Sequence, residues 1–354
     1  MKKIRVLVVD DSALVRSLLK EIINRQIDME CVGAASDPLV ARGMIRELDP
    51  DVITLDVEMP KMDGLDFLGR LMRLRPTPVV MISTLTEHGA EVTIKALELG
   101  AVDFVAKPRV ELVGGFGSLS SQIVDKIRIA ARARVSRLVP NTDNAPSKVE
   151  AREFVGKSMS RFDAKSLIFV GASTGGTEAI REILVKLPAV FPGIAITQHM
   201  PPGFTATFAA RMNDLCRIEV REAVNGARIL PGHAYIAPGG KHFSVARNSV
   251  GYMAVVDDGE PVNRHKPSVD VLFRSAARVV GPYAYGIMLT GMGDDGAIAM
   301  REMKDAGSYN FVQNESSCVV FGMPREAILR GAADEVLPIS DIAGALVERV
   351  SRVS

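Results

Sequence analysis

The chain has 354 residues and a formal net charge of +1, and 47% of its residues are hydrophobic. A chain of this length has room for about two domains of roughly 150 residues, and its balanced charge argues against a nucleic-acid-binding or membrane-surface protein. No stretch approaches the ~18–20 apolar residues of a membrane span, and three scattered cysteines with neither metal-ligand nor disulfide spacing fit a reducing cytoplasm.

The first part of the chain alternates short apolar runs with amphipathic stretches. Strands are predicted at Ile4–Val9, Cys31–Ala35, Val52–Leu55, Val79–Ile82 and Phe104–Val105. Helices are predicted to begin near Ser12, Pro38, Gly64 and Glu87, and a last helix is predicted from about Leu119 to Val139. This alternation indicates a five-stranded parallel sheet with helices on both faces, in a compact doubly wound domain. The N-terminal run is short and ends at two aspartates, so we interpret it as a buried strand rather than a signal peptide.

The composition changes between residues 126 and 165. Lysine and arginine outnumber the acidic residues there, and "VPNTDNAPSK" clusters Pro, Asn, Asp and Ser without apolar periodicity. We assign residues 1–125 to a first domain, 126–165 to a helix end and linker, and 166–354 to a second domain. A basic linker can contact nucleic acid, but this one lacks interleaved aromatic residues, so we favour a solvated tether.

The second domain also alternates strands with helices. The apolar runs "LIFV", "IAIT", "RIEV" and "YGIML" are predicted strands. Helices are predicted near Thr177–Leu187, Thr205–Asn213, Ser268–Val280, Ala297–Ala306 and Pro324–Arg330. Between Pro231 and Val256, short alternating segments separated by glycine turns predict a β-hairpin excursion. We therefore expect a second doubly wound α/β domain that carries a hairpin.

Polar residues follow the strands of the first domain. Asp10 and Asp11 follow the first strand, and Asp56 ends the third. Ser83 and Lys107 follow the fourth and fifth. Because sites in open α/β sheets form beyond the carboxyl ends of strands, we expect these groups to gather at one edge. Three carboxylates held together suit Mg²⁺, and with a lysine they suit phosphoryl transfer to a carboxylate. The alternative, in which the first two aspartates only cap a helix, leaves the other groups unexplained.

These residues stand in motifs that resemble a known family. "VLVVDDS", "DVITLDVEMPKMDG", "VVMIST" and "GAVDFVAKP" are similar to a response-regulator receiver domain over its whole length. The resemblance implies a flavodoxin-like fold in which Asp56 accepts the phosphoryl group. It also implies that Asp10 and Asp11 hold Mg²⁺ together with Asp56. The implied switch residues are Ser83, which bonds the phosphoryl group, Lys107, which pairs with it, and Phe104, which shifts on activation.

The stretch "GASTGG", residues 171–176, raises a question of chemistry. It lacks the lysine of a phosphate-binding loop and the spacing of a dinucleotide loop. Residues 171–175 fit G-x-S-x-G, which presents Ser173 on a sharp strand-to-helix turn as a nucleophile. A purely structural glycine turn remains the alternative.

A serine nucleophile requires a base and an orienting carboxylate. Among the five histidines, His199 directly follows a predicted buried strand, at the same sheet edge as Ser173. Asp294 and Asp295 follow a third apolar run, and their spacing does not distinguish between them. Backbone N–H groups among the glycines around Met292 are candidate donors to an oxyanion.

The second domain resembles a second family. "GASTGGTEAI", "QHMPPGFT", "LTGMGDDGA" and "SSCVVFGMPREAI" are similar to the catalytic domain of the chemotaxis protein-glutamate methylesterases, the CheB family, from about Leu167 to Pro338. The resemblance implies a Ser–His–Asp triad that demethylates glutamate methyl esters and deamidates glutamines, without a cofactor for the hydrolysis. The residues that it implies are Ser173 as nucleophile, His199 as general base, Asp295 as orienter, Met292 as an oxyanion donor and Thr174 beside the nucleophile.

The implied partners are methyl-accepting chemotaxis receptors as substrates and the chemotaxis histidine kinase CheA as phosphodonor. Phosphorylation of Asp56 would relieve inhibition of the catalytic domain by the receiver. Two other functions fit the sequence less well. An output domain that only binds partners would not need the histidine and aspartate, and a DNA-binding output domain would need a basic recognition helix, which the helices near Thr205 and Ser268 do not provide.

Overall fold

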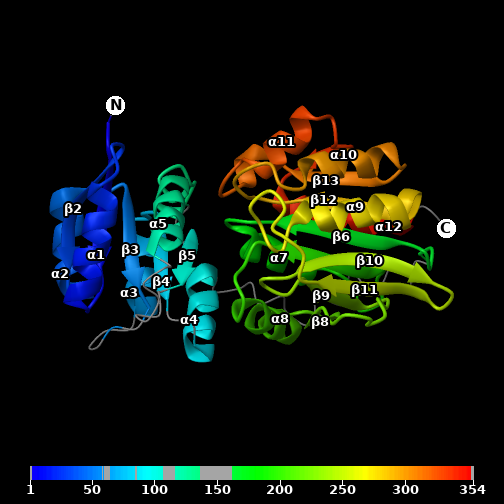
Figure 1. Ribbon diagram of the computed structural model, residues 1–354, viewed down its shortest axis with the longest axis horizontal. Helices are drawn as coiled ribbons and strands as arrows, with labels where there is room; N and C mark the ends of the chain where they lie inside the picture. The colour runs from blue at the N-terminus through cyan, green and yellow to red at the C-terminus, as the bar shows by residue number, and fades with distance from the viewer. Residues whose placement is uncertain are drawn as a thin grey trace. The chain divides into compact units, whose positions relative to one another are not determined.

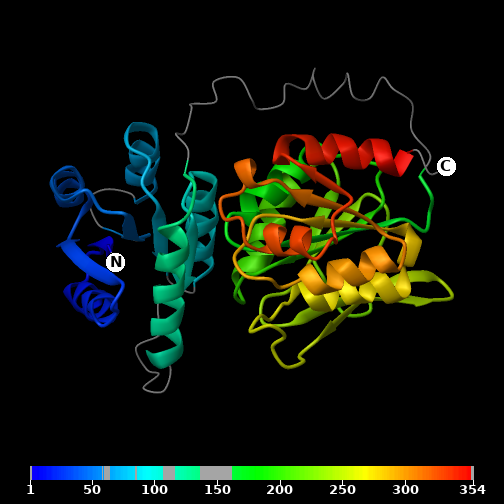
Figure 2. The same ribbon diagram turned by 90° about the horizontal axis from the view of Figure 1, so that it is seen from above.

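A computed structural model describes residues 2–57, 59, 64–83, 86–106, 116–135 and 162–351 (Figures 1 and 2). The predicted Lys107 and most of the predicted linker lie outside these residues. The chain divides into two compact units, Met1–Pro140 and Asn141–Ser354. No helix in the described ranges combines the length and apolar character needed to cross a membrane.

The first unit is built around a parallel sheet of order β2-β1-β3-β4-β5. Its strands are β1 Ile4–Val9, β2 Met29–Ala35, β3 Val52–Asp56, β4 Val79–Ser83 and β5 Asp103–Ala106. Its helices are α1 Ala13–Asn24, α2 Pro38–Leu48, α3 Gly64–Leu74, α4 Glu87–Glu98 and α5 Phe116–Ala130. Helix α1 packs against α5, and α3 packs against α4. The predicted doubly wound domain with five parallel strands is therefore confirmed.

The end of α5 differs from the prediction. The helix ends at Ala130, whereas the sequence pattern predicted a helix continuing to about Val139. Its buried stripe consists of Ile123, Val124, Ile127 and Ala130, and no buried residue follows as far as residue 135. Beyond Ala130 the arginine-rich stretch has no apolar face to pack, so the helix gains nothing by continuing.

The second unit has a seven-stranded sheet of order β14-β13-β12-β6-β7-β9-β8, with every neighbouring pair parallel. The strands are β6 Leu167–Ala172, β7 Gly193–Gln198, β8 Glu219–Glu222, β9 His233–Ile236, β12 Ala284–Met288, β13 Tyr309–Gln313 and β14 Glu335–Leu337. The helices are α7 Gly176–Leu184, α8 Phe204–Leu215, α9 Val269–Val279, α10 Ala297–Asp305, α11 Met323–Leu329 and α12 Ile339–Ser351, with short 3₁₀ turns at Gly281–Tyr283 and Glu315–Ser317. Helices α9 and α10 lie on one face of the sheet and α7 and α12 on the other (Figure 2).

The predicted hairpin exists, but it is shorter than expected. Strands β10 (His242–Asn248) and β11 (Gly251–Asp257) form a separate antiparallel pair that packs on α9 (Figure 1). The segment His233–Ile236, which the sequence pattern assigned to the hairpin, instead joins the main sheet as β9, parallel to β7 and β8. Its residues Ala234 to Ile236 are almost fully buried, which a strand covered on both faces requires.

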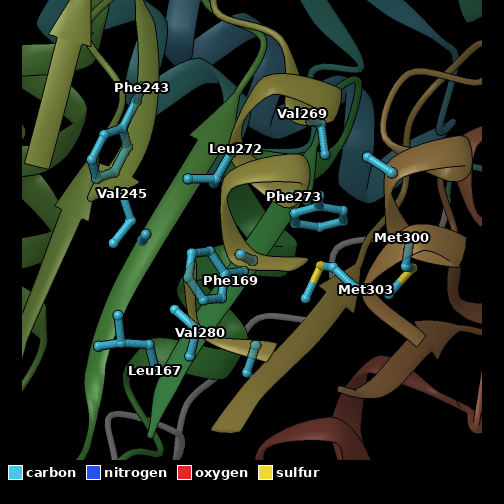
Figure 3. Packing of buried hydrophobic residues seen from close by; sticks show 14 of the residues in the cluster. Leu167, Phe169, Phe243, Val245, Val269, Leu272, Phe273, Val280, Met300 and Met303 are labelled. Atoms are coloured by element: carbon cyan, nitrogen blue, oxygen red, sulfur yellow. The ribbon is translucent and has the colours of Figure 1, made fainter. Parts of the chain in front are cut away.

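A hydrophobic cluster fixes α9 and α10 against the sheet (Figure 3). Phe169 of β6 and Phe273 of α9 are fully buried in it. Burial of such a side chain contributes roughly 1.5–3 kcal/mol. Helix α9 comes close to β6 because Gly171 has no side chain: a Cβ there would lie 2.3 Å from Cγ1 of Val269. This packing holds the loops beyond the carboxyl ends of the strands, where the candidate site lies.

Candidate functional sites

Ser173 is the first residue after β6, at the turn into α7. Its N–H donates to the carbonyl of Thr290 over 3.0 Å, and its carbonyl accepts from the N–H of Gly176 over 2.7 Å. The turn passes through Gly175, whose φ of 77° lies in the left-handed region that glycine adopts without strain. A sharp strand-to-helix turn thus carries the serine, whose side chain is nearly buried.

His199 is the first residue after β7 and lies beside Ser173. Ala172 and Gln198 are paired in the parallel register of β6 and β7, so the next residue of each strand is Ser173 and His199. The backbone N–H of His199 donates to the carbonyl of Ala172 over 3.1 Å, which continues the ladder by one step. The two residues that the sequence placed at one sheet edge are therefore neighbours there.

Asp295 reaches the same edge from the loop after β12. Its Oδ2 lies 2.8 Å from Nε2 of His199, and the two side chains are 1% and 7% exposed. The adjacent Asp294 is 59% exposed and lies 3.6 Å from Arg330 at the surface. The structure therefore distinguishes the two aspartates that the spacing left open, since only Asp295 contacts the imidazole.

Asp295 is held as a carboxylate by several donors. Its Oδ1 accepts from Oγ of Ser268 and Nδ2 of Asn263, each over 2.8 Å, and its Oδ2 accepts from the N–H of Val269 over 2.6 Å. Burial alone would raise the pKa of this carboxyl. The opposing effects are larger: the hydrogen bond and charge of His199, and the hydrogen bonds from Asn263 and Ser268. Together they hold the pKa of Asp295 well below its usual range.

The hydrogen bond to Asp295 fixes the tautomer of His199. A charged carboxylate only accepts hydrogen bonds, so Nε2 of the imidazole must carry the proton. The other ring nitrogen, Nδ1, is buried and has no hydrogen-bond partner among the described residues. In the neutral ring Nδ1 is therefore the atom with a lone pair available to accept a proton.

The residues predicted to neighbour the proposed triad also lie at this edge. Met292 is in the β12–α10 loop, and its backbone N–H donates to no other residue in the described ranges. Thr174 is buried, and its carbonyl accepts from Oγ1 of Thr290 over 3.0 Å. The Met292 N–H is available as a donor to an oxyanion, whereas Thr174 helps to fix the turn after Ser173.

The first unit has a cluster of three carboxylates. Oxygen atoms of Asp10, Asp11 and Asp56 all lie within 4.8 Å of one another, and Asp10 and Asp56 are buried whereas Asp11 is exposed. Helix α1 is capped by Oγ of Ser12, which accepts from the N–H of Val15, so capping by the aspartates does not explain the cluster. Hard oxygen donors grouped with one side open to solvent are the donor set that suits Mg²⁺.

The predicted switch residues are only partly described. Ser83 ends β4 beside the cluster and is buried, and its Oγ accepts from Oγ1 of Thr93 over 2.7 Å. Phe104 lies in β5, paired with Met81, and is 7% exposed. Lys107 falls outside the described residues, so its predicted contact with the phosphoryl site stays a prediction.

Three residues around the predicted triad were not anticipated from the sequence. Asn263 and Ser268 bind the Asp295 carboxylate, and the ring of His265 stacks on that of His199. The pattern of "NRHKP" indicates only a polar loop. One signal was available in the sequence: a polar loop that runs directly into the amphipathic helix α9, at the carboxyl edge of the sheet, is well placed to contribute to a site.

Taken together, the two units have the folds and polar clusters of a response regulator with a hydrolase-type output domain. The receiver-domain model of response regulators matches residues 6–113, and the CheB methylesterase model matches residues 168–346. The chain belongs to the CheB family of protein-glutamate methylesterases/protein-glutamine glutaminases.

Individual relatives agree with this assignment. A protein-glutamate methylesterase/protein-glutamine glutaminase 1 from Albidiferax ferrireducens is 69% identical over 355 residues, which cover 99% of this chain and 95% of the relative. A protein-glutamate methylesterase/protein-glutamine glutaminase from Methylobacillus flagellatus is 58% identical and covers 98% of this chain and 96% of the relative. Among solved structures, the CheB methylesterase catalytic domain of Thermotoga maritima is similar with a TM-score of 0.51 and 34% identity, covering 53% of this chain and 98% of that chain.

Proposed function

We propose that this protein hydrolyses γ-methyl esters of glutamate, and deamidates glutamines, on methyl-accepting chemotaxis receptors. Two observations support the mechanism: the buried Asp295 is hydrogen-bonded to His199, and Ser173 and His199 are neighbours at the ends of adjacent strands. A serine beside a histidine whose second nitrogen is held by a carboxylate is the arrangement that activates a hydroxyl as a nucleophile.

The reaction has two halves. The Oγ of Ser173 bonds to the γ-carbonyl carbon of the substrate, and its proton passes to Nδ1 of His199. The charge on the carbonyl oxygen is stabilised by the N–H of Met292, since donors placed where charge develops contribute strongly to catalysis. The intermediate then expels the methoxy group, which takes the proton from His199 and leaves as methanol. Water attacks the acyl-serine with His199 again as base, and free glutamate is released.

Deamidation follows the same course with ammonia as the leaving group. In both reactions Asp295 stays ionised and stabilises the imidazolium that forms on His199. The low pKa of Asp295 supports this role, because a carboxylate that readily accepted the proton would cease to orient the ring.

The first unit regulates this site in our proposal. Asp56 accepts a phosphoryl group from the chemotaxis histidine kinase CheA. Asp10, Asp11 and Asp56 would hold Mg²⁺, which supplies positive charge to offset the phosphoryl oxygens. Ser83 and Lys107 contact the added group, Phe104 shifts, and the receiver releases its inhibition of the esterase. The protein then acts in the cytoplasm on the receptors' cytoplasmic helices, without nucleic acid and without inserting into the membrane.

The test is methanol release from methylated receptor membranes by the full chain, with Mg²⁺ and a small phosphodonor. We expect Ser173→Ala to lower the rate by at least about 10³-fold, since a triad serine acts as part of a unit. Ser249→Ala is the matched control, because Ser249 is exposed in the turn between β10 and β11. Normal turnover by Ser173→Ala, with its fold intact by circular dichroism, would end the serine mechanism.

A further inference from the structure

The ring of His265 lies flat against the ring of His199. The ring centroids are 3.7 Å apart, and the ring planes differ by 10°. Asp295 holds His199 at one edge atom, Nε2. A single hydrogen bond leaves the ring free to tilt about that contact, whereas a stacked ring resists the tilt. The two contacts together fix the direction in which Nδ1 points.

A tight turn places His265. Val262 and His265 exchange both backbone hydrogen bonds, over 3.1 and 2.9 Å. The two residues between them, Asn263 and Arg264, have φ of 51° and 67°, as in the two-residue turns that require left-handed backbone. Left-handed conformation is unfavourable for a non-glycine residue, and such strain persists where surrounding contacts impose it.

The same turn reaches the carboxylate of the triad. Nδ2 of Asn263 donates to Asp295 and to the buried Asp270, each over 2.8 Å. Two residues of this turn thus contact the pair: Asn263 binds Asp295, and His265 stacks on His199, although 66 positions separate His199 from His265 in the sequence. The contacts of Asn263 and His265 are the tertiary constraints that hold the turn in its strained form.

We propose that His265 is a positioning residue, whose neutral ring orients His199 toward Ser173. When His265 is protonated, its positive charge opposes the positive charge that forms on His199 during the reaction. This inference rests on the proposed serine mechanism. During the reaction His199 becomes an imidazolium. A second positive ring stacked at 3.7 Å would repel that charge. The reaction therefore proceeds with His265 neutral.

Other charged groups surround the pair and are the same in the native chain and in variants at position 265. They are Asp295 on the β12–α10 loop, Asp270 and Arg274 on α9, Arg264 within the turn, Lys266 directly after it, and Asp258, which pairs with Lys266. His242 of β10 is held by other contacts, since its Nδ1 accepts from the N–H of Ser268 and its Nε2 contacts the carbonyl of Glu260. Differences between the native chain and variants at position 265 therefore report on His265.

The experiment compares His265→Ala with His265→Phe in the full chain. Phenylalanine keeps a ring in the stack but carries no proton. We expect His265→Ala to lower kcat by about 10- to 100-fold with KM nearly unchanged, because a misdirected base loses orientation rather than substrate binding. His265→Phe should recover most of that loss. His233→Ala is the matched control, since His233 contacts Glu219 and Pro231 on β9, away from the triad.

The spectroscopic readout is the NMR titration of the His199 ring. In the native chain its ¹³Cε1 shift should move in two steps, because protonation of one ring opposes protonation of the other. In His265→Phe the shift should move in a single step. A one-step titration in the native chain, or a His265→Phe variant as slow as His265→Ala, would overturn the proposal.

The outcomes separate this inference from the proposed function. If the native chain releases no methanol at all, the serine mechanism fails, while the NMR titration still decides whether the rings are coupled. If the native chain is active and all three histidine variants match it, the mechanism stands and the role of His265 is wrong. If His265→Ala fails to fold, His265→Phe and the titration still decide.

Discussion

His199 and Asp295 are joined by a hydrogen bond of 2.8 Å between Nε2 and Oδ2, across 96 positions of the sequence. The contact forms because β7 and β12 both flank β6, so the loops beyond their carboxyl ends meet above the same strand. Along the chain these residues follow the order serine, histidine, aspartate, which differs from the order in α/β-hydrolases.

The adjacent aspartates provide a direct test of this contact. Asp295→Asn should reduce kcat by about 10⁴-fold, as when a triad carboxylate is replaced by an amide that favours the wrong imidazole tautomer. Asp294→Asn is the control, since Asp294 is exposed and does not contact His199. Methanol release from methylated receptors measures both. Equal losses in the two variants would show that the orienter has been assigned to the wrong residue.

Acid should weaken the second unit through Asp295. Its folded-state pKa lies below that of the unfolded chain, about 3.9, so the unfolded state takes up a proton first as the pH falls. The stabilisation is complete above about pH 5 and is lost progressively below that value. Asp295→Asn has no such proton to gain, so its stability should fall less steeply between about pH 5 and 3.

Urea titrations read by hydrogen exchange would measure this, because peptides from β6 and α9 report on the second unit alone. The comparison needed is the change in unfolding midpoint with pH for the native chain and for Asp295→Asn. Parallel curves would mean that the donors around Asp295 do not perturb its ionisation in the folded state.

Phosphorylation should act through Asp56. A small phosphodonor with Mg²⁺ is expected to raise methanol release by the native chain, and Asp56→Asn should show the same rate with and without the donor. Asp66→Asn is the matched control, since Asp66 is exposed in the first turn of α3. Chelation of Mg²⁺ should abolish the stimulation, because the three carboxylates would then repel the incoming group. Stimulation of Asp56→Asn equal to that of the native chain would refute this regulation.

Much of the fold follows from local patterns in the sequence. Apolar runs located all five strands of the first unit, and the position of a polar residue directly after a buried strand placed Ser173 beside His199. These are inferences from periodicity and from the geometry of parallel sheets, which short segments already encode. Strand β9 was misassigned because a four-residue run next to a true hairpin has no local feature that shows which sheet it joins.

Contacts between distant loops leave little trace in local patterns. The spacing of Asp294 and Asp295 is compatible with either residue as orienter. The choice depends on tertiary contacts such as the bond from the N–H of Val269, at the start of α9, to Asp295. Asn263 and His265 were missed for the same reason, since their partners lie in other loops and their own segment has no apolar periodicity. The end of α5 was also predicted wrongly. The helix ends at its last buried residue, Ala130, and local helix propensity does not show where burial ends.

The orientation of the His199 ring has a consequence for chemical labelling. Its Nε2, the ring nitrogen farther from the main chain, is hydrogen-bonded to Asp295. Its Nδ1, the nitrogen nearer the main chain, has no hydrogen-bond partner in the described ranges. An electrophilic substrate analogue that alkylates the reactive imidazole nitrogen should therefore yield π-alkylhistidine at this position after digestion, rather than the τ isomer.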